Sequence, residues 1–320
     1  MSIEGDALIW IDLEMDGLDL TKNFILEIAC IVTDFHLTTN FEGPDLVIHH
    51  PKELLDAMGP WCMEHHTKSG LVRQVLASQL SMSDAEQQII DFIEKQTNKS
   101  NRRILAGNSV YVDRYFLEKD MPKLNSLLDR SILDCSTLKE LISRFNPSIY
   151  RRAPIKGGNL HRALDDIRNS IEEFRYYQTT AFEQNQTIST RTFPKNKDPT
   201  KDLVWIDIDS GNIHCILTDS NLNIIDEVKN GKNDEDLMEF FRRNQIRYER
   251  TVVVAGRYLG PIRAELKILA PKFNEFCHYR SIDIDVVSLV CQKFYPQVYE
   301  QQPSNDPIEL LRFYRSSIFK

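Results

Sequence analysis

The chain lacks the excess of basic residues that a protein gripping a long nucleic acid would carry. It has 39 Lys and Arg against 47 Asp and Glu, a formal net charge of -8 at pH 7. Proteins that follow a long polyanion usually show a basic stripe. The balance therefore predicts either that nucleic acid is not bound or that only a very short piece is held.

Membrane spans, secretion signals and paired cysteines are also missing from the sequence. No apolar run is long enough to cross a bilayer, so no membrane partner is expected. The first residues, "MSIEGDALIW", show neither a basic stretch followed by an apolar one nor the Arg-rich pattern of a transit peptide. The six cysteines are scattered without a C-x-x-C motif, which indicates reduced thiols. We expect a cytoplasmic protein, with the mitochondrion as the alternative.

A repeated motif organises the chain. "LIWIDLEMDG" begins at Leu8 and "LVWIDIDSGN" at Leu203. After each motif, strands come first and then alternate with helices, an order typical of a mixed sheet flanked by helices. We therefore predict a duplicated α/β fold with a shortened second copy: a domain over 1–179, a polar Thr/Gln/Asn-rich linker over 180–202, and a second domain over 203–320.

Local patterns predict individual elements in the first copy. The segment 7–13 is apolar on both faces, as in a central buried strand, and 24–35 reads as a long strand. The segment 81–96 has helical periodicity. Ser83, followed three residues later by Glu86, is expected to cap that helix.

Acidic residues form the main candidate site. Asp12 and Glu14 lie two residues apart on the first strand, so their side chains share one face. Buried carboxylates on one face are costly unless a cation neutralises them. Taken alone, the short D-x-E motif is more often a strand end at which both carboxylates reach solvent. Asp113 lies in an apolar helical segment, and His161 and Asp166 frame the start of a later helix.

Taken together, four carboxylates and one histidine suit two hard ions, Mg²⁺ or Mn²⁺. Two such ions about 4 Å apart can hold both the attacking and the leaving oxygen of an in-line phosphoryl displacement. His161 would take the proton from the attacking water. Asp165 is the rival of Asp166 but points about 100° away around the helix.

Longer motifs carry a resemblance that covers residues 7 to about 178. They are "WIDLEMDGLD", "ILEIACIVTD", "GPDLVIH", "HTKSGL", "AGNSVYVDRYFL", "LDCSTLKEL" and "HRALDDIRNSIEEFRYY". These stretches resemble the oligoribonuclease family of DEDDh exoribonucleases. The resemblance implies a ribonuclease H-like fold and 3′-to-5′ cleavage of dinucleotides and very short RNA. It also implies that Asp12, Glu14, Asp113 and Asp166 bind the metal ions and that His161 is the general base.

The resemblance also maps substrate-binding positions onto Leu18, Trp61, His66, Ser109, Ser136 and Lys139. Leu18 corresponds to a leucine wedged between two bases and Trp61 to an aromatic residue that supports a base, a sequence-tolerant contact. The two serines and the lysine correspond to residues at the 5′ phosphate. His65, next to His66, is a rival for its role. Leu18 and Trp61 could instead be core residues, and Lys139 a solvated helix charge.

The second copy is degenerate at the metal-binding positions. Asp207 and Asp209 match the first two acids, but Ile262 stands where Asp113 is expected. Val298 and Pro303 stand in place of the histidine and the last aspartate, and the segment corresponding to Trp61 and His66 is missing. We predict that this copy has no metal site and no nuclease activity. In the simplest interpretation, the second copy only packs against its neighbour and stabilises it.

Another family motif, a His-Tyr-Arg triplet, is absent from the first copy and present in the second. Family members are homodimers in which a His-Tyr-Arg triplet contributes to the partner's site. The first copy reads "DRS" at 129–131, whereas the second reads His278, Tyr279 and Arg280. Our hypothesis is that the second copy replaces the missing subunit, giving a pseudo-dimer within one chain. Tyr279 would contact the dinucleotide, and Arg280 its 5′ phosphate. The alternative is an ordinary homodimer formed through the first copy.

Two other functions compete with this interpretation. A non-catalytic scaffold or RNA-binding protein could keep the fold, but it would have no need for clustered carboxylates. A DEDDh exonuclease acting on longer strands would be expected to carry more positive charge.

Overall fold

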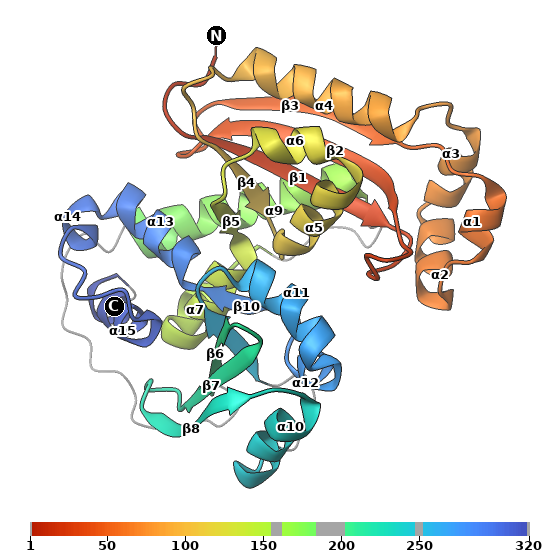
Figure 1. Cartoon of the computed structure of the whole chain (residues 1–320). Helices are drawn as coiled ribbons and strands as arrows, with labels where there is room; N and C mark the ends of the chain where they lie inside the picture. Colours follow the sequence, from red (N-terminus) through yellow and green to blue (C-terminus); the bar gives the residue numbers. More distant parts are fainter. Residues whose placement is uncertain (1, 155–161, 184–201, 247–251, 319–320) are drawn as a thin grey trace. The chain divides into compact units, whose positions relative to one another are not determined.

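The computed structural model describes residues 2–154, 162–183, 202–246 and 252–318. The chain forms two compact units (Figure 1). The first unit comprises Met1–Cys135 and Pro154–Arg175, and the second comprises Ser136–Ala153 and Tyr176–Lys320. The two units do not coincide with the predicted domains 1–179 and 203–320. Residues 136–153 and 176–179 belong to the first copy in sequence but to the second unit in the structure. Those boundaries stay a prediction about which residues belong to which copy.

The first unit is built on a five-stranded mixed sheet in the order β3-β2-β1-β4-β5. β1 (Ala7–Met15) lies at its centre, as expected, and pairs antiparallel with β2 (Ile25–Asp34). β3 (Asn40–Val47) pairs antiparallel with β2, whereas β4 (Arg103–Gly107) and β5 (Ile132–Asp134) continue the sheet in parallel. This is the ribonuclease H-like arrangement that the sequence predicts.

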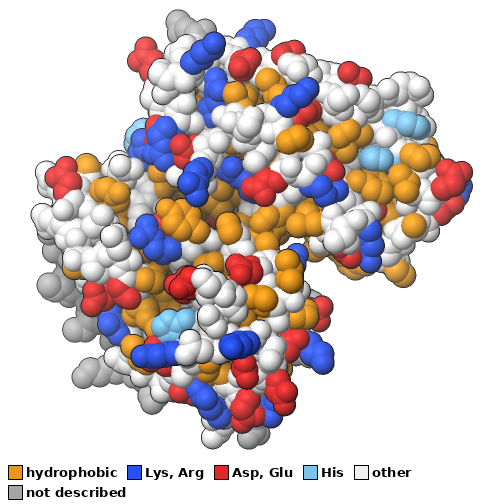
Figure 2. Space-filling view, in the orientation of Figure 1, with side chains coloured by type: hydrophobic (Ala, Val, Ile, Leu, Met, Phe, Trp, Pro, Cys, Tyr) orange, Lys and Arg blue, Asp and Glu red, His pale blue; other side chains and the backbone are white. Residues whose placement is uncertain are grey.

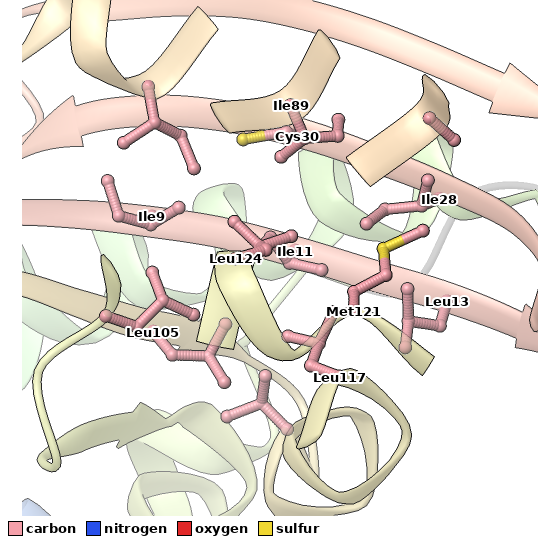
Figure 3. Close-up of a cluster of buried hydrophobic side chains, with 14 of the residues drawn as sticks. Ile9, Ile11, Leu13, Ile28, Cys30, Ile89, Leu105, Leu117, Met121 and Leu124 are labelled. Atoms are coloured by element: carbon pink, nitrogen blue, oxygen red, sulfur yellow. The ribbon is translucent and has the colours of Figure 1, made fainter. Parts of the chain in front are cut away.

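Helices cover both faces of this sheet. They are α1 (Lys52–Asp56), α2 (Pro60–Lys68), α3 (Leu71–Ala77), α4 (Met82–Gln96), α5 (Tyr111–Asp120), α6 (Pro122–Leu127) and α9 (Ala163–Tyr177). Alternate side chains of β1 point to opposite faces. Figure 3 shows Ile9, Ile11 and Leu13 meeting residues of α4, α5 and α6 in one apolar core. On the other face, Trp10 packs against Phe174 of α9, with ring centroids 6.0 Å apart.

The predicted cap of α4 is wrong by two residues. Ser81, not Ser83, is the N-cap, and its hydroxyl accepts a hydrogen bond from the Asp84 amide at 3.1 Å. Ser81 and Asp84 are three residues apart, as are Ser83 and Glu86, and it is the Ser81–Asp84 pair that starts the helix. Glu86 is buried and instead accepts from the amides of Lys123 and Leu124. Glu86 therefore provides hydrogen-bond acceptors for backbone amides in the first turn of α6.

The second unit contains a sheet of the same order, β8-β7-β6-β9-β10. Its strands are β6 (Leu203–Asp209), β7 (Asn212–Thr218), β8 (Ile224–Gly231), β9 (Val253–Gly256) and β10 (Ser281–Asp283). Its helices are α10 (Asp234–Arg243), α11 (Leu259–Leu269), α12 (Pro271–Phe276), α13 (Ile284–Phe294), α14 (Pro296–Tyr299) and α15 (Pro307–Ser317). The first copy adds most of α7 (Cys135–Phe145), α8 (Pro147–Tyr150) and the π-helical turn η1 (Gln178–Glu183).

Matching contacts recur in the two units. The Trp10 indole donates to the Thr33 hydroxyl of β2 at 2.9 Å, and the Trp205 indole donates to Thr218 of β7 at the same distance. Likewise, the guanidinium of Arg114 donates to the carbonyl of residue 129, and Arg263 donates to that of residue 278. The common strand order and these paired contacts establish the duplicated α/β arrangement.

The second copy is shortened most between its third strand and the helix that follows it. α10 begins at Asp234, directly after β8 ends at Gly231, whereas α1–α3 precede α4 in the first unit. The deletion removes the counterpart of the segment that carries Trp61 and His66, as the sequence predicts.

Two expectations about the surface and the thiols can be compared with the structure. On the face drawn in Figure 2, Lys and Arg are interspersed with Asp and Glu. The six cysteines, all among the described residues, form no disulfide. Among the described residues, no helix has the length and apolar character needed to span a membrane.

Candidate active site

Three of the predicted metal-binding carboxylates meet in the first unit. One oxygen from each of Asp12, Glu14 and Asp166 lies within 4.8 Å of the others. Asp12 and Glu14 share the β1 face of Trp10, which packs on Phe174 of α9. Asp166 lies eight residues before Phe174, about 12 Å along the helix. Because Glu14 lies about 13 Å along the strand from Trp10, α9 carries Asp166 to the two strand carboxylates.

The clustering has a marked electrostatic consequence for Glu14. Burial, together with the nearby carboxylates of Glu27, Asp166 and Asp113, raises the pKa of Glu14 to about 9. A carboxyl group with this pKa holds a proton at neutral pH unless a cation replaces it. Carboxylate oxygens are the ligands that Mg²⁺ and Mn²⁺ prefer. The donor set therefore fits a divalent ion.

Asp113 lies beside this group in the first turn of α5. Its Oδ1 accepts a hydrogen bond from the Leu13 amide at 3.0 Å, between the two strand ligands. Burial raises the pKa of the Asp113 carboxyl to about 8, against the effect of that hydrogen bond, and Asp134 adds to the rise. The carboxylate is thus held at the strand that carries Asp12 and Glu14, although it is outside the group of three.

The rival of Asp166 points away from the site. The Asp165 side chain is 59% exposed and forms an ion pair with Arg168 at 2.9 Å. Asp166 therefore supplies the carboxylate of α9. The predicted general base, His161, lies outside the described residues.

Leu18 and Trp61 are not core residues, so that alternative is wrong. They are 62% and 61% exposed. The loop before Leu18 is fixed by the buried Asp16, which accepts from the Phe24 amide at 2.7 Å and from the Asn23 side chain at 3.0 Å. A Cβ on Gly17 would lie 2.5 Å from the Asn23 side chain, so that side chain and its hydrogen bond to Asp16 would have to shift. Folding thus holds an apolar side chain in solvent.

Of the two adjacent histidines, His66 faces the carboxylates. It is buried, and its Nε2 donates to the Met15 carbonyl at 2.9 Å. Its Nδ1 lies 3.9 Å from Glu14 Oε2. His65 instead stacks on the Trp61 ring, with centroids 3.9 Å apart.

The predicted phosphate-binding and triplet residues are divided between the units. Ser109 lies in the first unit with φ +54°, and its amide donates to Asp134. Ser136 is buried on α7 in the second unit, where Lys139 is half-buried. Tyr279 and Arg280 belong to the same unit.

The second unit also holds the triplet against α7. Tyr279 is 53% exposed, and the Arg280 guanidinium lies 5.3 Å from its ring centroid. Arg280 forms an ion pair with Glu140 of α7 at 3.2 Å. Thr137 of α7 donates to the Ser281 carbonyl and accepts from the Asp283 amide of β10. The triplet residues and the helix that carries Ser136 and Lys139 are therefore parts of one compact unit.

No comparable acidic group exists in the described part of the second unit. Asp207 and Asp209 are exposed, and their carboxylates accept hydrogen bonds from their own neighbours, the Ile208 amide and the Ser210 hydroxyl. Ile262 packs against the apolar core of that unit. The three-carboxylate group in the first unit is the one such cluster among the residues described.

Sequence reasoning missed Glu27 and Arg162. The fully buried Glu27 on β2 binds Arg162, the residue before α9, with Nε–O distances of 2.9 and 3.2 Å. The available signal was Glu27 itself, a carboxylate with apolar residues on both sides in "ILEIACIVTD", because a buried charge needs a partner.

Known proteins share this first half. The family model described as Exonuclease matches residues 9–174. An oligoribonuclease of Arabidopsis thaliana is 49% identical over 182 residues, covering 56% of this chain and 81% of the relative. A mitochondrial oligoribonuclease of Mus musculus is 43% identical over 197 residues, covering 62% and 82%. Exonuclease I of Methylocaldum szegediense, a solved structure, is 16% identical with a TM-score of 0.46 and covers 98% of this chain and 85% of that one.

The fold, the carboxylate group and the match over 9–174 define an exonuclease. More narrowly, at 43–49% identity over most of each relative, the chain belongs to the oligoribonuclease family.

Proposed function

We propose that this protein is a divalent-metal-dependent 3′-to-5′ exoribonuclease that cleaves dinucleotides and very short RNA to mononucleotides. The observation that carries the proposal is the convergence of Asp12, Glu14 and Asp166 in a chain of the oligoribonuclease family. Asp113, held at the same strand, completes the proposed ligand set. The clustered carboxylates argue against a scaffold, because their mutual repulsion is unfavourable unless a cation binds between them.

The chain's own residues have separate tasks in this reaction. Asp12, Glu14, Asp113 and Asp166 would hold Mg²⁺ or Mn²⁺, two ions in all. When bound, the ions neutralise the carboxylates and act as Lewis acids toward the phosphate. His161 accepts the proton of the attacking water. The Nε2–H of His66 donates to the Met15 carbonyl, which orients Nδ1 toward Glu14.

Substrate length is set by residues at the edge of the site. The exposed Leu18 and Trp61 would contact the two bases, and such contacts tolerate any sequence. Ser109, Ser136 and Lys139 would bind the 5′ phosphate and leave no room for a longer chain. The net charge of -8 supports this, because an RNA of two residues needs no basic stripe.

The second copy would act as a built-in subunit without chemistry of its own. Tyr279 is exposed, and the Arg280–Glu140 ion pair joins the triplet to the helix that carries Ser136 and Lys139. We propose that Tyr279 contacts the RNA and that Arg280 contacts its 5′ phosphate. The protein would then work as a monomeric pseudo-dimer in the cytoplasm or, like the relative from Mus musculus, in mitochondria.

A length series tests the function. 5′-Labelled RNAs of two to twenty residues, with Mg²⁺ or Mn²⁺, are expected to show cleavage of the dinucleotide at least about tenfold faster than of the longest RNA. A long RNA cannot place its 5′ phosphate on Ser109, Ser136 and Lys139, and hydrogen bonds to a charged group contribute about 1.5–3 kcal/mol. Equal rates at both lengths would favour an exonuclease for longer strands. No cleavage of any length would favour a scaffold.

The acids of the second copy should be dispensable. The double variant Asp207→Asn/Asp209→Asn is expected to keep dinucleotide turnover within about twofold, because both side chains are exposed and bind only their neighbours. Steady-state kinetics of the full-length protein measures this. A loss approaching that of a first-copy metal ligand would contradict the assignment of a single metal site.

A further inference from the structure

Glu27 is a buried charge directly beside the carboxylate group. In the antiparallel pairing of β1 and β2 it lies opposite Glu14, and side chains of directly paired residues share one face. Glu27 is fully buried. A buried carboxylate next to other carboxylates is tolerated only with a strong partner.

That partner is the first turn of α9. The Arg162 Nε lies 2.9 Å from one Glu27 oxygen and 3.2 Å from the other. The amide of Ala163, the first residue of α9, donates to Glu27 Oε2 at 3.3 Å. The Arg162 carbonyl in turn accepts from the Asp166 amide at 3.0 Å. Glu27 therefore connects β2 to the helical turn that carries Asp166.

The same contact controls where the positive charge of Arg162 lies. The hydrogen bonds to Glu27 raise the pKa of Arg162, and the carboxylates of Asp45 and then Glu14 add smaller effects. The guanidinium is therefore held at Glu27, and the Arg162 backbone is held with it at the start of α9.

We infer that Glu27 is a positioning residue for the metal site. Through Arg162 and Ala163 it fixes the turn of α9 that places Asp166 beside Glu14. The inference rests on the proposed metal-dependent function, but it concerns how the ligands are arranged rather than which RNA is cleaved.

The test is the Glu27→Gln variant of the full-length protein. Glutamine preserves the shape but removes the charge that holds Arg162. We expect Mn²⁺ binding, measured by isothermal titration calorimetry without RNA, to weaken at least about tenfold, since second ligand-shell changes typically cost 10–100-fold in metal affinity. The Mn²⁺ concentration giving half-maximal turnover should rise by a similar factor. Unchanged Mn²⁺ affinity in folded Glu27→Gln would overturn the inference.

Glu42→Gln is the matched control. Glu42 on β3 forms an exposed ion pair with Arg168 of α9 at 2.7 Å, so it also joins a strand to this helix, but away from the carboxylates. Its Mn²⁺ affinity should stay within about twofold, as exposed ion pairs contribute little. An equal loss in Glu42→Gln would overturn the inference, because any strand–helix ion pair would then have the same effect.

A second variant decides the matter if Glu27→Gln does not fold. Arg162→Lys keeps the charge but loses the paired hydrogen bonds to Glu27. We expect weaker Mn²⁺ binding in this variant as well, and wild-type affinity would overturn the inference. The binding measurement uses Mn²⁺ alone. Failure of the wild-type protein to cleave RNA would therefore refute the proposed function without deciding the role of Glu27.

Discussion

Asp12→Asn is expected to lower dinucleotide turnover by roughly 10³-fold, at the upper end of the losses seen when a single electrostatic group is removed from an active site. Asp12 is one of three carboxylates whose oxygens lie within 4.8 Å of each other. Asparagine retains one oxygen but not the charge that attracts a divalent ion. Single-turnover rates with saturating Mn²⁺ separate this loss from weaker substrate binding.

Folding should respond to this substitution differently from activity. The Asp12 carboxylate lies within 4.8 Å of two other carboxylate oxygens, so removing its charge should leave the melting temperature of the metal-free protein unchanged or raised. Asp165→Asn is the matched control, because its side chain is exposed and bound to Arg168; its turnover should stay within about twofold. An active Asp12→Asn protein, with less than a tenfold loss, would refute the proposed metal site.

Tyr279→Ala should reduce kcat/KM for a dinucleotide by roughly 5- to 150-fold, corresponding to the 1–3 kcal/mol of one aromatic–base contact. The side chain is 53% exposed and stacks on His278, with ring centroids 4.6 Å apart. Losing an exposed ring has little effect on stability. A large kinetic loss would therefore indicate contact with the RNA.

Tyr258→Ala is a close control for this experiment. Tyr258 is in the same unit, is 58% exposed and also lies beside an arginine, Arg257, whose guanidinium is 5.8 Å from the ring centroid. Its replacement should leave kcat/KM within about twofold. Equal kinetics for Tyr279→Ala and the wild type, or a dimeric mass in solution, would favour an ordinary homodimer over the pseudo-dimer.

The sequence was most informative where periodicity and local motifs coincide. The apolar character of β1 on both faces predicts its central place, and the two-residue spacing of Asp12 and Glu14 predicts their common face. The helical angle between neighbouring residues selects Asp166 over Asp165. The repeated "WID" motif predicts the duplicated arrangement, which the matching strand orders confirm.

Features that depend on distant packing were not predictable in the same way. Which serine caps α4 depends on Glu86 being used at α6, 37 residues away. The exposure of Leu18 and Trp61 cannot be read from residue type, since both are usually buried. The assignment of α7 to the second unit also has no local signal, because its partner strand lies far along the chain.

That last feature has a consequence for biosynthesis. Thr137 of α7 bonds to Asp283 of β10, 146 residues later. At about 5–20 residues per second, a ribosome needs roughly 7–30 seconds to make the intervening chain. During that time the first sheet can assemble, but α7, with Ser136 and Lys139, still lacks the strand on which it docks. A nascent chain that ended before β10 would thus leave the apolar face of this helix open to aggregation or to chaperones.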